Sequence, residues 1–171
     1  MRFIKLAIIS FIVLALIITG MSMFFPSHIR LSKAINIKAS QDSILAQIRD
    51  AGNWKNWFPG TDTAKLYFEN GQAKGVILDD RDSSRPVYIH ITKETGDEVV
   101  AEMVTNKMKP VVNGWKTISY PSGDSITLQW YMDFHLRWYP WEKFRSLILE
   151  RSYGPKMEKG LSDLRTLLQA K

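Results

Sequence analysis

The sequence predicts an α+β domain, in which a curved antiparallel sheet of about seven strands wraps on a long C-terminal helix, preceded by one transmembrane helix. Three observations support this fold class. The chain begins with an uncharged apolar run, continues with segments of alternating polarity joined by short turns, and ends with apolar residues at helical spacing. These patterns are typical of a membrane span, of strands with one buried face and of an amphipathic helix.

The apolar run from Leu6 to Phe25 contains no charged side chain. At ~1.5 Å per residue it makes a helix about as long as the ~30 Å hydrocarbon core is thick. We therefore interpret residues 1–26 as a transmembrane anchor and residues 27–171 as one domain. A cleaved signal peptide ending near Gly20–Ser22 and a buried core helix are the alternatives. Basic residues flank the run on both sides, so the side of the membrane that the domain occupies stays open.

Seven segments show the period of two that is typical of strands. The last of them, Ile126–Arg137, alternates most regularly, so it predicts one apolar face and one face open to solvent. Asn70-Gly71 predicts a two-residue hairpin, because a type I′ turn needs two positive φ angles. The other predicted strands are residues 29–38, 65–69, 73–78, 87–94, 98–104 and 111–120.

One predicted helix follows the first strand in the sequence, and the others follow the last strand. Ser40 is the expected N-cap of a short helix that ends near Gly52. The C-terminal segment carries an apolar stripe of Phe144, Leu147, Ile148, Met157, Leu161, Leu164 and Leu168. Because proline costs ~3 kcal/mol inside a helix, Gly154-Pro155 predicts a kink or break. We expect one helix to about Tyr153 and a second from Pro155 to Ala170.

Composition excludes several function classes. The formal net charge is +6. Arg2 and Lys5 account for two of the 23 basic residues, which leaves the domain 21 basic against 17 acidic residues and a net charge of +4. This mild excess is dispersed, so nucleic acid is not an expected partner. The absence of cysteine excludes disulfides, thiol catalysis and cysteine zinc sites. No metal or cofactor motif is present in the sequence, so neither is expected.

Three stretches together resemble the START-like or SRPBCC superfamily, whose helix-grip fold includes polyketide cyclase/dehydrase and lipid-transport proteins. They are residues 35–48, the stretch Gly52–Trp57 with Pro59, and the ending Gly154–Leu164. The resemblance covers about residues 29–170, and it is strongest to bacterial members, many of which begin with one membrane helix. It implies an inner-membrane location and a cavity between helix and sheet for a hydrophobic ligand. It does not imply one reaction.

The resemblance also selects candidate ligand-binding residues on the apolar faces of the sheet and the terminal helix. The alternative for each is plain core packing. Trp54 and Trp57 form a lid at the cavity mouth, a plug at one end of the core, or both. Trp138, Tyr139 and Trp141 form either a packed corner or a contact with the membrane interface. The candidate ligand-binding residues are Trp57, Phe58, Ile89, Ile91, Met103, Trp130, Met132, Phe134, Met157 and Leu161.

Catalytic constellations are sparse. His90 and His135 lie on the polar side of their strands, and Asp79, Asp80 and Asp82 are expected in a solvated loop. The sequence therefore favours a membrane-anchored module that binds a lipid or another lipophilic small molecule, and it leaves open whether a reaction is catalysed. The alternatives are a cyclase or hydratase on the same fold, and a protein-interaction domain, akin to the chaperone-activating members, whose cavity is filled.

Overall fold

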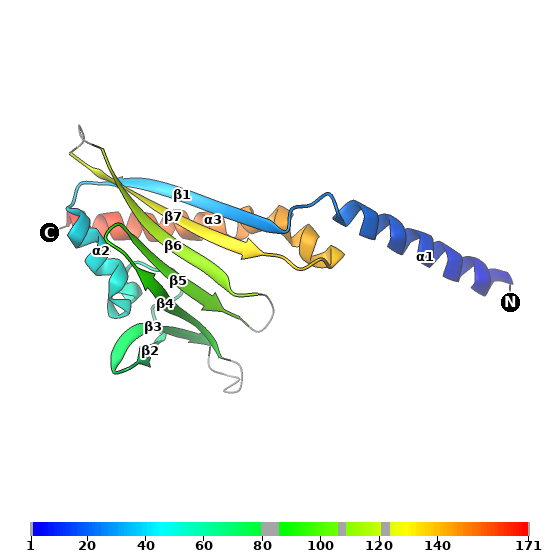
Figure 1. The fold of residues 1–171 in the computed structure, drawn as a ribbon, viewed down its shortest axis with the longest axis horizontal. Helices are drawn as coiled ribbons and strands as arrows, with labels where there is room; N and C mark the ends of the chain where they lie inside the picture. The colour runs from blue at the N-terminus through cyan, green and yellow to red at the C-terminus, as the bar shows by residue number, and fades with distance from the viewer. Residues whose placement is uncertain (1, 80–85, 106–108, 121–123, 171) are drawn as a thin grey trace.

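The computed structural model describes residues 2–79, 86–105, 109–120 and 124–170. It confirms the predicted fold class, a curved seven-stranded antiparallel sheet with a long C-terminal helix and an apolar N-terminal helix (Figure 1). The elements are α1 (Arg2–Ser22), β1 (His28–Ile37), α2 (Gln41–Arg49), the 3-10 helix η1 (Ala51–Asn56), β2 (Lys65–Glu69), β3 (Gln72–Asp79), β4 (Val87–Glu94), β5 (Glu98–Val104), β6 (Val111–Ser119), β7 (Ile126–His135) and α3 (Pro140–Gln169).

The first strand lies beside the last one. The strand order is β1-β7-β6-β5-β4-β3-β2, so β1 and β2 are the two edges of the sheet. The predicted hairpin between β2 and β3 is confirmed, because Asn70 and Gly71 have φ angles of 51° and 78°. The alternating apolar residues of β7 face the interior of the domain. Leu128, Trp130, Met132 and Phe134 are all buried.

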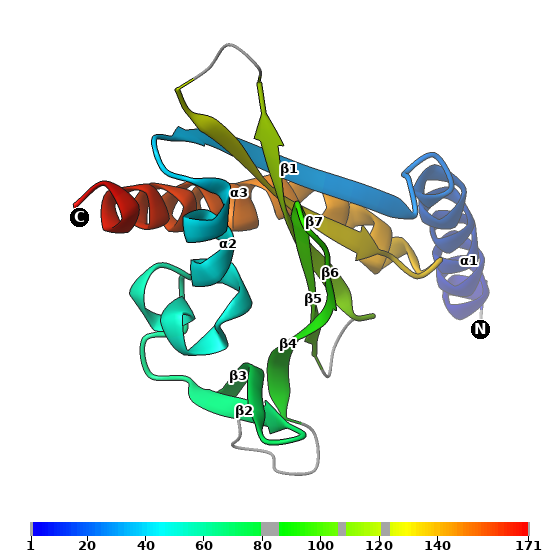
Figure 2. The ribbon, with the colours of Figure 1, turned by 60° about the vertical axis from the view of Figure 1, so that its left-hand side comes forward.

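α3 lies along β1 rather than over the middle of the sheet (Figures 1 and 2). Met157, Leu161 and Leu164 form its buried face. Lys33 on β1 adds a polar clamp, since its Nζ lies 2.7 Å from Glu150 Oε1 and 2.9 Å from Glu158 Oε1. β2 and β3, at the opposite edge of the sheet, are far from α3 in both views.

Of the predicted kink or break in the C-terminal helix, the break was wrong, because α3 runs as one helix through Pro155. The clash that disfavours helical backbone before proline involves the Cβ of the preceding residue. Gly154 has no Cβ, so this part of the clash is absent at the residue before Pro155. The predicted stripe was also wrong in its first half: Leu147 and Ile148 are 65% and 55% exposed, and Leu149 is buried instead.

α1 extends away from the domain, and its C-terminal end lies beside the N-terminal end of α3 (Figure 1). It is long and apolar enough to cross a membrane, and none of its most apolar stretch is buried in the protein. A helix of this kind near the N-terminus is typical of both a membrane anchor and a signal sequence. Two contacts attach its end to α3: Phe25 packs edge-on against Phe144 at 5.2 Å, and Lys143 Nζ donates to the Phe25 carbonyl at 2.9 Å.

The outer face of the sheet carries an ion pair between β1 and β7. Arg30 donates two hydrogen bonds to Asp133, at 2.7 and 2.6 Å, and its guanidinium lies 4.5 Å above the centre of the Tyr131 ring. The Arg30 hydrogen bonds hold the pKa of Asp133 below its ordinary value. Burial, followed by the hydrogen bond to Glu98, raises the pKa of Tyr131 to about 12.

We expect this pair to make stability depend on acid pH. A lowered carboxyl pKa contributes stability that is present above the unfolded-state pKa and is lost as the pH falls through the folded-state value, here below about pH 5. Because the Arg30 side chain is 56% exposed, the contribution is at most about 1 kcal/mol. Thermal unfolding from pH 7 to pH 3 should therefore show a smaller acid loss in Asp133→Asn than in the wild type.

The control for this prediction is Asp163→Asn, which removes an exposed i,i+4 pair with Lys159 on α3. It should follow the pH profile of the wild type closely. An identical acid loss in Asp133→Asn and in the wild type would contradict the assignment to Asp133.

Candidate functional site

The candidate site is an apolar cavity under the concave face of the sheet. Because α3 lies along β1, it leaves the inner face of the central strands partly uncovered. A cavity of about 260 Å³ occupies this space and is partly open to solvent. Three parts of the chain line it: strands β3 to β7, the turn after η1, and the middle of α3. The lining residues are Phe58, Pro59, Gly60, Leu78, Ile89, Met103, Asn113, Trp130, Met132, Tyr153, Lys156 and Met157.

The inner wall of the cavity is apolar and buried. Ile89, Trp130 and Met132 come from the sheet, and Met157 comes from α3, and each is at most 4% exposed. Three methionines line the cavity. Because methionine is flexible and polarisable, such a wall adapts its shape to an apolar ligand. Few convergent polar groups and a mainly apolar lining are typical of small-molecule sites.

Asn113 is the buried polar group of the cavity. Its Oδ1 accepts a hydrogen bond from Trp130 Nε1 at 3.4 Å, and its Nδ2 donates to the Val111 carbonyl at 3.3 Å. Sequence analysis did not single out this residue. The sequence pattern could have identified it, because Asn113 alternates with the same period as Val111 and Trp115 on β6 and so lies on the same buried face. An amide held in this way offers both a donor and an acceptor to a ligand.

The mouth of the cavity carries its ionisable groups. Tyr153 and Lys156 lie on adjacent turns of α3, at the solvent side of the lining. The Tyr153 ring packs against Phe134 at 5.0 Å, and Lys156 Nζ lies 5.9 Å from the centre of the Tyr153 ring. A cation at this position is suited to the polar end of an elongated ligand whose apolar part lies inside.

The tryptophans after α2 form a plug rather than a lid. Trp54 is fully buried and donates from Nε1 to the Ile48 carbonyl at 2.7 Å, and Trp57 donates to the Gln47 carbonyl at 3.3 Å. Their rings pack against three other aromatic rings, stacked, tilted or edge-on, at centroid distances of 5.6 to 6.3 Å. We call this cluster the aromatic plug; it consists of Trp54, Trp57, Phe58, Trp115 and Trp130.

Six of the ten candidate ligand-binding residues line the cavity: Phe58, Ile89, Met103, Trp130, Met132 and Met157. The other four lie elsewhere. Trp57 is inside the aromatic plug, and Ile91 and Leu161 belong to the packed core. Phe134 lines a separate pocket at the start of α3. The role of all ten in ligand binding stays a prediction.

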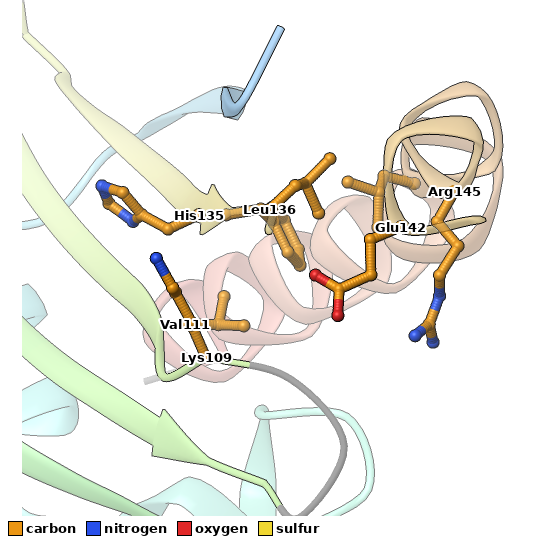
Figure 3. A pocket seen from close by; sticks show the side chains of 8 residues that line it. Lys109, Val111, His135, Leu136, Glu142 and Arg145 are labelled. Carbon is orange, nitrogen blue, oxygen red and sulfur yellow. The ribbon is translucent and has the colours of Figure 1, made fainter. Parts of the chain in front are cut away.

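That separate pocket is too small for an organic ligand. It encloses about 10 Å³, close to the space of one water molecule. In Figure 3 the Glu142 carboxylate points toward this pocket, whereas Arg145 points away from it. Glu142 Oε2 accepts a hydrogen bond from the Arg137 backbone N–H at 2.7 Å, so this carboxylate ties the first turn of α3 to the segment that precedes the helix.

The candidate catalytic residues do not come together. His90 lies on the outer face between Tyr67 and Tyr88, and His135 stacks on His28 with a centroid distance of 4.6 Å. Asp79 ends β3, while Asp80 and Asp82 lie outside the described residues. Within the described ranges, no group of three or more metal-binding side chains occurs.

The model of one protein family, described as polyketide cyclase / dehydrase and lipid transport, matches residues 28–169. The chain belongs to this family. The match covers the sheet, the aromatic plug and all of α3, and it begins after α1. No curated protein matches the chain.

Solved structures of the family's fold resemble the chain at low sequence identity. The di-domain ARO/CYC protein BexL from the BE-7585A biosynthetic pathway is 12% identical, with a TM-score of 0.63 over 85% of this chain and 51% of BexL. The chain thus spans about half the length of BexL. The Zhui aromatase/cyclase from Streptomyces sp. R1128 is 12% identical, with a TM-score of 0.61 over 83% of this chain and 94% of Zhui.

A START superfamily protein from Mycobacterium smegmatis is similar to the same degree. It is 13% identical, with a TM-score of 0.59 over 82% of this chain and 97% of that protein. At this identity the likeness shows the fold alone. The fold places the cavity between sheet and helix, and the residues of this chain decide what the cavity binds.

Proposed function

We propose that the chain is a membrane-anchored binding module for a lipid or another lipophilic small molecule. The observation that carries this proposal is the apolar cavity of about 260 Å³, partly open to solvent, between the sheet and α3. In the proposed arrangement residues 1–26 anchor the chain in the membrane, and residues 27–171 form the binding domain. The family description, which includes lipid transport, supports the same class of ligand.

Transfer of apolar ligand surface from water supplies the binding energy. Burying roughly 200 Å² of apolar surface at ~25 cal/mol per Å² gives about 5 kcal/mol, before the cost of association is subtracted. The buried Asn113 amide orients a polar group inside the cavity, and Lys156 at the mouth favours a ligand with an acceptor or an anionic end. We therefore expect an amphipathic ligand, with its apolar part against Trp130 and Met132.

The two alternatives are less well supported. A protein-interaction domain with a filled interior would leave no space beside Trp130 and Met132, whereas both residues line the cavity. A cyclase or hydratase needs a positioned acid or base. Within the described lining, Tyr153 and Lys156 are the ionisable groups, and both lie at the mouth rather than on the buried wall.

Filling the cavity should abolish binding. Met103 lines the cavity from β5, and Met103→Trp should place the larger ring in the space that the ligand occupies. We expect the full chain, reconstituted in nanodiscs of one synthetic phosphatidylcholine, to retain apolar molecules from the producing cell. Native mass spectrometry should detect them on the wild type and show at least a tenfold loss on Met103→Trp.

The matched control is Glu102→Trp, which adds the same ring on the outer face of the same strand. Glu102 is the neighbour of Met103 and pairs with His90 across the sheet. This variant should retain the ligand at the wild-type level. The proposal fails if the wild type carries no apolar molecule other than the nanodisc lipid, or if Met103→Trp retains the ligand as well as Glu102→Trp does.

A further inference from the structure

A groove between α1 and the start of α3 forms a second candidate site, separate from the cavity. We call it the junction groove, and it has two connected parts that share Thr19 and Trp138. The apolar part encloses about 400 Å³ and is lined by Phe11, Leu14, Ala15, Ile18, Thr19, Trp138, Tyr139, Pro140 and Trp141. The polar part encloses about 300 Å³ and is lined by Thr19, Ser22, Met23, Ser27, Trp138 and Lys143.

Lys143 is a buried cation at the polar part of the groove. The residue is only 7% exposed. Its ammonium donates to the Phe25 carbonyl at 2.9 Å and to the Ser27 hydroxyl, both of which are neutral. No ion pair joins it to a carboxylate anywhere in the described part of the chain. Because a lysine ammonium has three donors and a buried charge is costly without a counter-charge, this position favours an anionic ligand.

The apolar part of the groove is lined by aromatic side chains that remain exposed. Trp138 is 69% exposed and Trp141 is 65% exposed, although both belong to the turn that starts α3. The interpretation of this turn as a packed corner was therefore wrong. Tryptophan is favoured at the level of lipid headgroups, where one part of its ring is apolar and another part is wet.

The order of the two parts along α1 matches the order of groups in a phospholipid. The polar part lies at the end of α1 that meets the domain, at Ser22 and Ser27. The apolar part extends toward the middle of the helix, and from Thr19 to Phe11 this distance is about 12 Å at ~1.5 Å per residue. A lipid with its phosphate at the membrane surface would therefore place its acyl chain against Phe11–Ile18.

We propose that the junction groove binds one anionic phospholipid, with the phosphate on Lys143 and an acyl chain between α1 and Trp138–Trp141. The proposal rests on the proposed membrane anchor, since only an α1 that lies in a bilayer presents the groove to lipid. The bound lipid supplies the counter-charge of Lys143 and fixes the orientation of the domain on the membrane.

Tryptophan quenching by brominated lipids tests this proposal. The chain has six tryptophans. Trp54, Trp57 and Trp115 are buried in the aromatic plug and Trp130 lines the cavity, so Trp138 and Trp141 are the two at the junction groove. Quenching by a lipid in the groove is the part that Ala15→Phe removes, because this variant leaves Trp130 and the cavity unchanged. The full chain is reconstituted in phosphatidylcholine vesicles that contain about 5% of phosphatidylglycerol brominated in its acyl chains. We expect this lipid to quench more strongly than the same fraction of brominated phosphatidylcholine.

Two variants separate a lipid site from general contact with the bilayer. Lys143→Met removes the charge and should weaken the preference for phosphatidylglycerol at least about tenfold, whereas Lys143→Arg should keep it. Because Lys143 is buried, replacing it can also disturb the fold of the domain. Ala15→Phe avoids this problem, since it changes only α1 and fills the apolar part of the groove. Ala7→Phe, on the same helix outside the groove, is its matched control.

Five results would overturn the proposal. Equal quenching by the two brominated lipids in the wild type would do so, as would an unchanged preference in Lys143→Met or Ala15→Phe. Complete competition by millimolar inorganic phosphate would assign the site to free phosphate instead. Release of the wild type from the vesicles by alkaline carbonate would overturn both this proposal and the membrane anchor, whereas retention with equal quenching would overturn only the lipid site.

Discussion

Replacing Trp57 with alanine is expected to lower the free energy of unfolding of the domain by about 3–5 kcal/mol. Trp57 is 2% exposed, and its ring contacts Phe58, Trp115 and Trp130 edge-on. Removing it leaves a cavity in the centre of the aromatic plug, where four large rings cannot easily close the space. This loss is a large fraction of the roughly 5–15 kcal/mol that stabilises a typical domain. Urea denaturation of the full chain in detergent micelles measures it.

Trp141→Ala is the control for this prediction. It makes the same change at a residue that is 65% exposed, so the free energy of unfolding in micelles should change by less than about 0.5 kcal/mol. A cost below about 1 kcal/mol for Trp57→Ala would contradict the view that the plug is a rigid part of the core. That result would favour a mobile lid.

Gly160→Ala should destabilise the domain by about 1–3 kcal/mol, although alanine is the better helix former. A Cβ built at Gly160 would lie 2.8 Å from Pro59 Cδ and 2.9 Å from Trp130 Cζ3, and 3.2 Å from the Trp57 carbonyl oxygen. All three contacts belong to rigid groups at the plug and the cavity edge. The added methyl group must push α3 away from the sheet, so the clash outweighs the gain of about 1 kcal/mol in helix propensity.

Ser152→Ala is the matched control on the same helix. Ser152 is exposed, so the substitution should be neutral or slightly stabilising, as expected from helix propensity alone. Thermal unfolding of the two variants beside the wild type gives the comparison. A higher melting temperature for Gly160→Ala than for the wild type would show that α3 has room at the plug.

Much of the fold followed from local patterns in the sequence. β2, β4 and β5 have the bounds that alternation predicted, and Asn70-Gly71 forms the predicted turn. Ser40 caps α2 as predicted, with its Oγ accepting from the Ser43 backbone N–H at 3.2 Å. These features depend on residues that are near one another in the chain, so the sequence carries them directly.

The course of α3 depended on tertiary contacts that the sequence pattern does not contain. An apolar stripe predicts a covered face but does not say what covers it. Leu147 and Ile148 fit the stripe, yet both are exposed, and the adjacent Leu149 faces Val111 and Phe134 of the sheet instead. Pro155 predicts a kink or break from its usual effect inside helices, and the missing Cβ of Gly154 removes one of the clashes behind that effect.

The alternation of residues along the strands predicted part of the candidate site. The part that depends on how the strands and the segment after α2 pack together was not predicted. Ile89, Met132 and Trp130 line the cavity because alternation places them on the inner face. Trp57 could not be assigned from sequence, because a lid and a plug share the same residue pattern. Asn113 was missed because its polar side chain was not weighed against the inward parity of its strand.

Because α3 is one continuous helix, it sets the distance between the junction groove and the mouth of the cavity. Lys143 and Lys156 lie thirteen residues apart on this one helix, so about 20 Å separates the junction groove from the cavity mouth. Half of the hydrocarbon core measures only ~15 Å. With α1 in a bilayer as proposed, a lipid held at Lys143 whose chains have their usual length in the bilayer would end short of the cavity. We therefore expect the junction groove and the cavity to hold separate molecules, with α3 as the spacer between the two sites.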